Sequence, residues 1–351
     1  MGEWVPDVLG DGFAQQTLPL GEDSEGELFA TVVRALPDPA PWWRFGDDPR
    51  PLNDVDVLYV HGWSDYFFQK RLARFWTSRG ARFFALDLRK YGRSLRPGQT
   101  PGFITDLGEY DVDIAAALDA RGDAEGRRLV LLGHSTGGLV LSLWASRHPR
   151  EVDAVILNSP WLEFQLGAAR AAIAPMVGLQ AKWWPMDAAP QVDLGFYTRA
   201  QAEAADPDDP MDINLEWRPE QSMIVHAAWL HAILEGHRAV SKGLEIDAPV
   251  CVLLSARTAL PTRWSDELTR TDSVLVVDDI ARAALKLGPS VTIERIEGAL
   301  HDVFLSARDA REDAYARLDR WVTGWAASQS EGRSRRPSPD AVRQPVRQRT
   351  P

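Results

Sequence analysis

The stretch Gly133-His134-Ser135-Thr136-Gly137 decides the fold of this chain. It matches Gly-x-Ser-x-Gly, with a short apolar run at 128–132 before it and a helix-like run at 138–145 after it. A serine on a sharp turn between a strand and a helix stands clear of both elements, and the flanking glycines allow the backbone to turn tightly. In this context the motif indicates that Ser135 is a nucleophile.

Working outward from this turn, apolar runs of strand length alternate with helix-like stretches. Most of the runs are almost continuously apolar, as is typical of parallel strands that are buried on both faces. The six runs lie at 56–60, 82–88, 129–132, 154–157, 249–254 and 291–296. The alternation predicts a doubly wound, mostly parallel sheet. Two earlier segments, 15–20 and 27–35, are expected to add an antiparallel edge, which gives eight strands in total.

The alternation stops between Pro160 and Asp247, in a stretch that is too long for one crossover connection. We interpret 160–247 as a helical cap inserted between two parts of one core, 14–159 and 248–327. From 328 to 351 arginine mixes with Pro, Ser and Gln, and large apolar residues are almost absent. That composition predicts a disordered, basic tail.

Composition narrows the range of partners and locations. The 351 residues are 45% hydrophobic and carry a formal net charge of -11, which favours a large core and argues against a nucleic-acid partner. The one cysteine, Cys251, lies within an apolar run, so we expect a buried thiol and no internal disulfide. The N-terminus lacks the pattern of a signal peptide, and no apolar run reaches the roughly 20 residues of a membrane span. We therefore expect a cytoplasmic protein; the composition leaves the oligomeric state open.

A nucleophilic serine needs a base and a carboxylate that orients this base, in the chain order Ser, Asp or Glu, His. His301 follows the last predicted strand, at the carboxyl edge of the sheet where open α/β folds bind ligands. The acid is expected just after the run 249–254, but Ser255-Ala256-Arg257-Thr258 contains none. We favour Asp272 as this acid, and rank Asp278 and then Asp266 behind it.

The tetrahedral intermediate of such a reaction needs two backbone N–H donors for its oxyanion. We expect one from Thr136, directly after the serine, and the other from Trp63, in the loop that follows the run 56–60. His61, in the same loop, is interpreted as a structural brace. Three other histidines, His226, His231 and His237, are spaced by five and six residues, which does not place them on one helical face, so we expect no metal site.

These residues resemble the α/β-hydrolase superfamily, and most of all its monoacylglycerol lipase and lysophospholipase-like branch, which is related to the serine aminopeptidases. The blocks 61–65, 87–94, 133–138 and 297–302 carry the resemblance, in this order. It implies the α/β-hydrolase fold, with Ser135 as nucleophile, His301 as base, and Trp63 and Thr136 as oxyanion donors. The family usually has its acid in a Gly-x-x-Asp turn, which this chain lacks at 255–258.

The function that follows is a serine hydrolase that cleaves carboxylic esters, such as monoacyl lipids, and needs no cofactor. An aminopeptidase or amidase is the first alternative. It would require an anionic subsite for a substrate ammonium group, for which the cap offers Glu163, Glu216, Glu220 and Glu235. The second alternative is a catalytically silent fold that binds a ligand or partner, and the missing acid after the run 249–254 motivates it.

Overall fold

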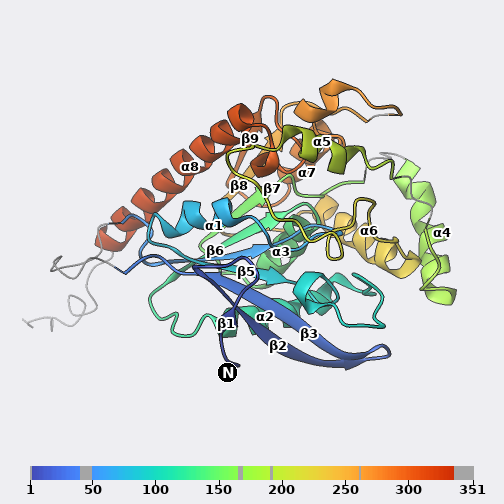
Figure 1. Ribbon diagram of the computed structural model, residues 1–351, viewed down its shortest axis with the longest axis horizontal. Helices are drawn as coiled ribbons and strands as arrows, with labels where there is room; N and C mark the ends of the chain where they lie inside the picture. The colour runs from blue at the N-terminus through green and yellow to red at the C-terminus, as the bar shows by residue number, and fades with distance from the viewer. Residues whose placement is uncertain (1, 40–49, 165–168, 190–192, 261, 336–351) are drawn as a thin grey trace, which may run out of the picture.

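The computed structural model describes residues 2–39, 50–164, 169–189, 193–260 and 262–335. A mixed sheet crosses the middle of this part of the chain, with helices on both of its faces (Figure 1). Its nine strands lie in the order β1-β2-β3-β5-β4-β6-β7-β8-β9. They are β1 (Val5–Pro6), β2 (Phe13–Asp23), β3 (Gly26–Ala35), β4 (Val55–Val60), β5 (Arg82–Asp87), β6 (Arg128–His134), β7 (Ala154–Asn158), β8 (Val250–Ser255) and β9 (Val291–Ile296).

Six strands, from β5 to β9 in spatial order, pair in parallel, and each coincides with one of the six apolar runs. The first three strands pair antiparallel, and β3 joins them to β5. The doubly wound, mostly parallel sheet is therefore confirmed. The count of eight strands is wrong by one, because β1 pairs through two residues only, Val5 with Gln15 and Pro6 with Ala14, and two residues show no periodicity.

Successive residues of each parallel strand point to opposite faces of the sheet, and each face is buried under its own helices. The helices of the core are α1 (Lys70–Thr77), α2 (Tyr110–Ala120), α3 (Thr136–Arg147), α7 (Val277–Ala284) and α8 (Arg308–Arg335). Val57 and Tyr59 pack with α1 and α8, while Leu58 and Val60 pack with α2 and α3 on the other side. This arrangement explains why the central runs are apolar at almost every position.

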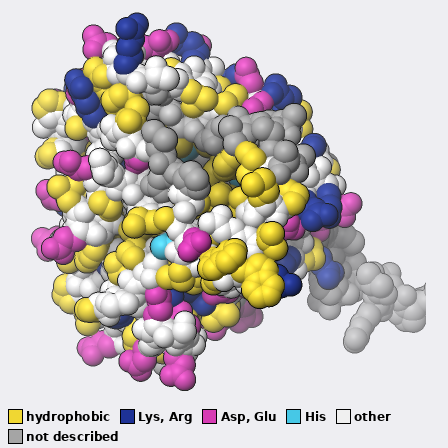
Figure 2. Space-filling model, turned by 90° about the vertical axis from the view of Figure 1, so that its right-hand side faces the viewer, with side chains coloured by type: hydrophobic (Ala, Val, Ile, Leu, Met, Phe, Trp, Pro, Cys, Tyr) yellow, Lys and Arg dark blue, Asp and Glu magenta, His cyan; other side chains and the backbone are white. Residues whose placement is uncertain are grey.

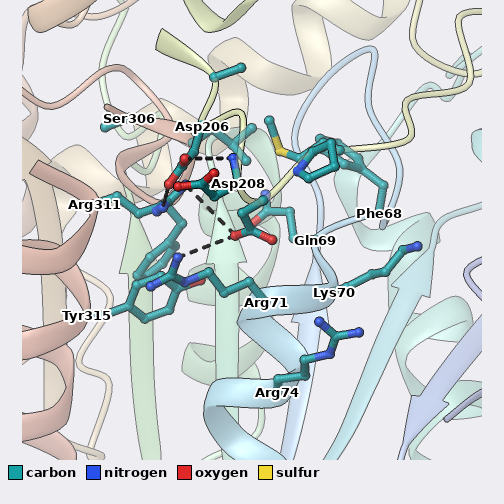
Figure 3. A pocket seen from close by; sticks show the side chains of 16 residues that line it. Phe68, Gln69, Lys70, Arg71, Arg74, Asp206, Asp208, Ser306, Arg311 and Tyr315 are labelled. Carbon is teal, nitrogen blue, oxygen red and sulfur yellow. Dashed lines mark hydrogen bonds and ion pairs between the residues drawn. The ribbon is translucent and has the colours of Figure 1, made fainter. Parts of the chain in front are cut away.

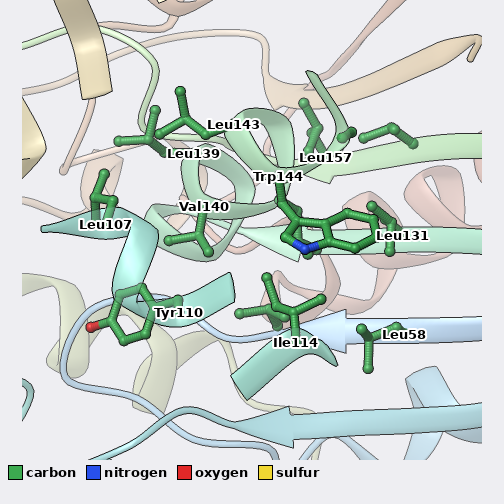
Figure 4. Packing of buried hydrophobic residues seen from close by; sticks show 14 of the residues in the cluster. Leu58, Leu107, Tyr110, Ile114, Leu131, Leu139, Val140, Leu143, Trp144 and Leu157 are labelled. Carbon is green, nitrogen blue, oxygen red and sulfur yellow. The ribbon is translucent and has the colours of Figure 1, made fainter. Parts of the chain in front are cut away.

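The helix that follows the serine is packed into the apolar cluster that contains Leu58 and Val60 (Figure 4). Leu139, Val140 and Leu143 of α3 lie against Leu107 and the side chains of α2. Trp144, one turn after Val140, lies beside Leu131 and Leu157 of the sheet. Buried on all these sides, α3 gives the serine turn a rigid base.

Three helices lie between β7 and β8, where the sequence predicts the inserted cap: α4 (Ala169–Trp183), α5 (Phe196–Ala204) and α6 (Ala227–Lys242). They differ in how deeply they are buried. Trp229, Ile233 and Val240 of α6 belong to the same apolar cluster as α3. The segment around α4 instead leaves large apolar side chains exposed, among them Leu179, Trp183 and Trp184. Figure 2 looks at the side of the molecule that carries α4, and hydrophobic side chains gather on it.

The tail prediction is wrong at its beginning. Helix α8 continues to Arg335, past the predicted boundary at 328. Backbone hydrogen bonds extend an existing helix by one residue at a time and need no apolar partner, so a polar sequence can prolong a helix that the core has already nucleated. The rest of the predicted tail, 336–351, lies outside the described residues. Cys251 is free and buried, as expected. No helix of the described ranges combines the length and apolarity that a membrane crossing requires.

Candidate active site

Ser135 occupies the tight turn between β6 and α3. Its φ of 50° and ψ of -117° lie in a region that residues with a side chain rarely adopt. The two glycines of the motif make the turn possible by close packing. A Cβ on Gly137 would collide with the backbone carbonyl oxygens of Val60 and His61, and one on Gly133 would lie 2.6 Å from the Cα of Gly138. The strand, the helix and the loop after β4 therefore meet at the serine.

Backbone hydrogen bonds hold the strained turn in place. The Ser135 N–H donates to the Asn158 carbonyl (3.0 Å), and the Ser135 carbonyl accepts from the Trp161 N–H (3.0 Å). Both partners belong to the end of β7 and the loop after it. The turn is thus fixed by the neighbouring strand as well as by its own helix, which is how a strained conformation persists in a folded protein.

Three side chains form one hydrogen-bonded chain. The Ser135 Oγ lies 3.0 Å from the His301 Nε2, and the His301 Nδ1 lies 2.9 Å from the Asp272 Oδ2. All three residues are buried, Asp272 completely. A carboxylate only accepts hydrogen bonds, so the Nδ1 of His301 carries the proton and its Nε2 is free to accept the serine proton. The structure thus brings together the three residues that the sequence singled out, in the geometry that an activated serine requires.

Asp272 reaches His301 because the loop that follows β8 returns to the edge of the sheet. Beyond β8 the chain leaves as a loop that includes a 3-10 helix (Asp266–Arg270), and then returns to form a parallel bridge between Thr258 and Asp272. The Asp272 N–H donates to the Arg257 carbonyl (3.0 Å), and the Asp272 carbonyl accepts from the Ala259 N–H (2.9 Å). The bridge places the acid beside the residues that directly follow β8, where the resemblance expects an acid.

The second oxygen of this carboxylate is also occupied. The Asp272 Oδ1 accepts hydrogen bonds from the backbone N–H groups of Val274 and Leu275, both at 2.8 Å. These two bonds fix the rotation of the side chain and leave the Oδ2 directed at the imidazole. The competing acids lie elsewhere: Asp278 is exposed and pairs with Arg295 (2.6 Å), and Asp266 is exposed at the start of the 3-10 helix.

The two expected oxyanion donors are available. Thr136 is the first residue of α3, where an N–H has no partner within the helix. Neither its N–H nor that of Trp63 donates a hydrogen bond to any group in the described part of the chain. Both residues line the same cavity as Ser135. The helix dipole of α3 adds a partial positive charge at this point, which favours an anion.

His61 braces the loop after β4, as the sequence suggests. Its Nε2 accepts from the Leu88 N–H (3.2 Å), and its Nδ1 donates to the Gly62 carbonyl (2.7 Å). Burial lowers the pKa of His61 and keeps the ring neutral, as an accepting nitrogen requires. The ring of His134, which the sequence analysis left aside, lies 5.0 Å from that of His301 and lines the cavity. Burial lowers the pKa of His134 too, although Asp302 opposes this shift.

A cavity of about 610 Å³ opens above the serine, and two parts of its wall differ in chemistry. One part is aromatic: the rings of Trp63 and Trp229 pack together with centroids 3.9 Å apart and planes tilted by 43°, and Trp161 and Phe164 continue this wall. Another part is polar. Its lining residues include Asp193, Tyr197, Thr198, Arg218, Glu220 and Ser222. The volume of the cavity is within the range of small-molecule sites, and its aromatic and polar walls suit a ligand with one apolar and one polar part.

The sequence did not predict a role for three polar residues near the site, Arg218, Asp65 and Tyr197. Arg218 of the cap forms a buried ion pair with Asp65, in the loop after Trp63 (2.9 Å). Tyr197 lies edge-on to the His301 ring and accepts a hydrogen bond from the Asp302 N–H. Burial raises the pKa of the Asp65 carboxyl, and Arg218 opposes that shift. No pattern along the chain reveals these contacts, because each joins residues of the cap to residues of the core.

A sheet of this order, with a strained serine between a central parallel strand and its helix, defines an α/β-hydrolase. Residues 53–260 match the family model for serine aminopeptidase, S33, and the chain belongs to this family. Within the described residues no group of three or more His, Cys, Asp or Glu side chains could hold a metal ion.

Named relatives and solved structures agree with this assignment. The chain is 28% identical over 174 residues to a monoacylglycerol lipase of Mycolicibacterium smegmatis, covering 48% of this chain and 59% of that protein. It is 28% identical over 180 residues to phospholipase YtpA of Bacillus subtilis, covering 49% and 67%. The matches thus span about 60% to two thirds of these relatives. The crystal structure of a Paleococcus ferrophilus monoacylglycerol lipase shares the fold (TM-score 0.57, 18% identity, covering 77% and 94%).

Proposed function

We propose that this protein is a serine hydrolase that cleaves carboxylic esters through an acyl-enzyme intermediate. One observation carries the proposal: the continuous hydrogen-bonded chain from Ser135 through His301 to the buried Asp272, at the base of a cavity. Serine hydroxyls are poor nucleophiles at neutral pH, and this arrangement is the one that activates them.

In the proposed mechanism the Ser135 Oγ attacks the carbonyl carbon of the ester, and the His301 Nε2 takes its proton. Asp272 stabilises the imidazolium that forms and keeps the ring in orientation. The Trp63 and Thr136 N–H groups bind the oxyanion of the tetrahedral intermediate. This intermediate collapses as His301 protonates the departing alcohol, and the acyl group stays on Ser135. Water, deprotonated by His301, then releases the acid. The mechanism needs no cofactor.

For the substrate we propose a small ester with an apolar acyl group, such as a monoacyl lipid. The aromatic wall of the cavity would take the acyl part, and the polar wall the alcohol part. The names of the relatives, a monoacylglycerol lipase and a phospholipase, support this class. The cytoplasmic location stays a prediction.

The first test is labelling of the purified protein with a fluorophosphonate probe, followed by mass spectrometry of the modified peptide. We expect a single adduct on Ser135 and none in Ser135→Ala. A labelled wild type that also hydrolyses p-nitrophenyl esters would support the proposal. Failure of both reactions, while a reference serine hydrolase reacts, would refute it.

The family match to serine aminopeptidases keeps an aminopeptidase as the second candidate. Of the four glutamates proposed for an ammonium subsite, Glu220 lines the cavity, whereas Glu235 pairs with Arg238 on the surface. Glu220→Gln separates the two functions. It should leave the hydrolysis of neutral esters unchanged, and it should raise the KM for aminoacyl amides only if the protein is an aminopeptidase.

The argument for a catalytically silent binding fold no longer applies. It rested on the lack of a carboxylate directly after β8, and the Asp272 carboxylate lies within hydrogen-bonding distance of His301. The fluorophosphonate experiment also decides this alternative, because a silent fold has no activated serine to label.

A further inference from the structure

The loop after β4 carries the Trp63 N–H, and the hydrogen bonds by which the core holds this loop lie at its two ends. At the beginning, His61 is bonded to the Leu88 N–H. At the end, the Phe67 N–H donates to Asp87 (2.8 Å), and the Phe67 carbonyl accepts from Arg93 (3.0 Å). The five residues between these ends include Ser64, whose φ of 54° is unfavourable for a residue with a side chain. Such a conformation persists only where its surroundings impose it.

The cap supplies contacts to the middle of the loop. The Met223 N–H donates to the Ser64 Oγ (3.1 Å), and the Asn214 N–H donates to the Tyr66 hydroxyl (2.8 Å). The ring of Trp63 packs against that of Trp229 in α6, with centroids 3.9 Å apart. One cap segment, 214–229, therefore touches Trp63, Ser64 and Tyr66 in turn.

Arg218 makes the charged contact of this set. Its Nε lies 2.9 Å from the Asp65 Oδ1, and both side chains are less than a tenth exposed, 9% for Arg218 and 6% for Asp65. Its Nη2 donates to the Gln201 Oε1 (2.7 Å) of α5, and its guanidinium lies over the Phe68 ring. Gln201 and Phe68 hold the guanidinium in one position, and from there its charge attracts the buried Asp65 carboxylate and restricts where this carboxylate can lie.

We propose that Arg218 is a positioning residue of the active site, which acts from the cap through Asp65 to hold the loop that presents the Trp63 N–H to the oxyanion. This inference rests on the proposed function, because it gives the loop the role of an oxyanion donor. The cap segment 214–229 then completes the catalytic machinery as well as covering the cavity. A shift of about 1 Å in such a group can lower a rate up to about 100-fold.

The chain offers a matched control in a second ion pair between the cap and the core. Asp206 lies at the end of α5, beside a smaller cavity of about 290 Å³ against α1 and α8 (Figure 3). Its carboxylate pairs with Arg311 (2.6 Å), with side chains 4% and 7% exposed, and also with Arg308. Asp206→Asn therefore weakens an equally buried tether of the cap and leaves the loop at 63–66 untouched.

The experiment compares Arg218→Gln, Arg218→Lys and Asp206→Asn with the wild type, after thermal melts show that each variant is folded. For p-nitrophenyl acetate we expect Arg218→Gln to lower kcat by about 10- to 100-fold, with KM within about threefold. A boronic acid, whose tetrahedral adduct on Ser135 places an oxygen in the oxyanion site, should bind more weakly by a similar factor. Arg218→Lys should fall in between, and Asp206→Asn should stay within about threefold of the wild type.

Hydrogen–deuterium exchange of the peptide that covers 61–68 tests the same idea without any substrate. We expect faster exchange in Arg218→Gln and unchanged exchange in Asp206→Asn. Unchanged exchange in both variants, or an equal loss of kcat in both, would overturn the inference. If the wild type itself neither labels nor hydrolyses esters, the proposed function fails, and the exchange result alone then decides whether Arg218 positions the loop.

Discussion

Replacing the buried acid with its amide is the sharpest test of the candidate active site. In Asp272→Asn the amide oxygen can still accept the N–H groups of Val274 and Leu275, which occupy the Oδ1 at 2.8 Å. The amide NH₂ then faces the His301 Nδ1 and donates to it. The proton moves to the Nε2, which can no longer take the proton of Ser135.

The magnitude follows from the loss of the base. Inverting the histidine tautomer in a serine triad lowers the turnover by about 10⁴-fold. This factor corresponds to about 5 kcal/mol of transition-state stabilisation, at 1.36 kcal/mol for each factor of ten. The fold should survive, because the variant keeps both backbone hydrogen bonds and its size, so we expect a melting temperature close to that of the wild type.

The assay is steady-state hydrolysis of p-nitrophenyl acetate, with Asp278→Asn as the control. Asp278 is exposed and pairs with Arg295 at the surface, so its variant should keep kcat within about twofold, as surface ion pairs contribute little. The reasoning is refuted if Asp272→Asn keeps a tenth or more of the wild-type kcat. It is also refuted if Asp278→Asn loses a factor of 100.

Three further predictions concern the turn, the brace and the cavity wall. Gly137→Ala should lower the free energy of unfolding in urea by about 2 kcal/mol or more, because the Cβ meets two backbone carbonyls; Gly324→Ala, in open space on α8, should raise it by about 0.5 kcal/mol. Burial lowers the pKa of His61, so on acidification the unfolded chain takes up the proton first and the native state loses stability. His61→Gln should therefore lower the free energy of unfolding by up to about 1.4 kcal/mol less at pH 5.5 than at pH 7.5. A greater destabilisation at pH 5.5 than at pH 7.5 would contradict this reasoning. Trp161→Ala should raise the KM for octanoyl esters about tenfold and leave that for acetyl esters within about twofold, whereas an equal change for both would exclude the aromatic wall as the acyl site.

Local sequence was most informative where a feature depends on neighbouring residues. The motif at 133–137 and the apolar runs around it predicted β6, α3 and the other parallel strands, because a strand that is buried on both faces is mostly apolar. The short β1 and the end of α8 were mispredicted. Strand β1 forms by pairing with β2, and the end of α8 continues a helix that already exists. Neither cause leaves a periodic pattern in the chain.

The acid shows how the two levels of information differ. The sequence favoured Asp272 and kept Asp278 and Asp266 as rivals, since all three follow β8 in the chain. The choice among their positions came from one β-bridge, Thr258 with Asp272, which closes the intervening loop and buries one carboxylate beside the imidazole. Loop closure depends on contacts between residues far apart in the chain, which local propensities do not encode.

By itself the sequence determined the α/β sheet, the serine turn and the histidine beyond the last strand, because each follows from local periodicity, glycine geometry and chain order. Only the tertiary structure decided which acid faces His301, that Arg218 reaches Asp65, and that aromatic and polar walls enclose one cavity. The physical reason is that the cap and the core are built from distant parts of the chain. Their mutual burial, and not the preference of any single segment, sets the contacts between them.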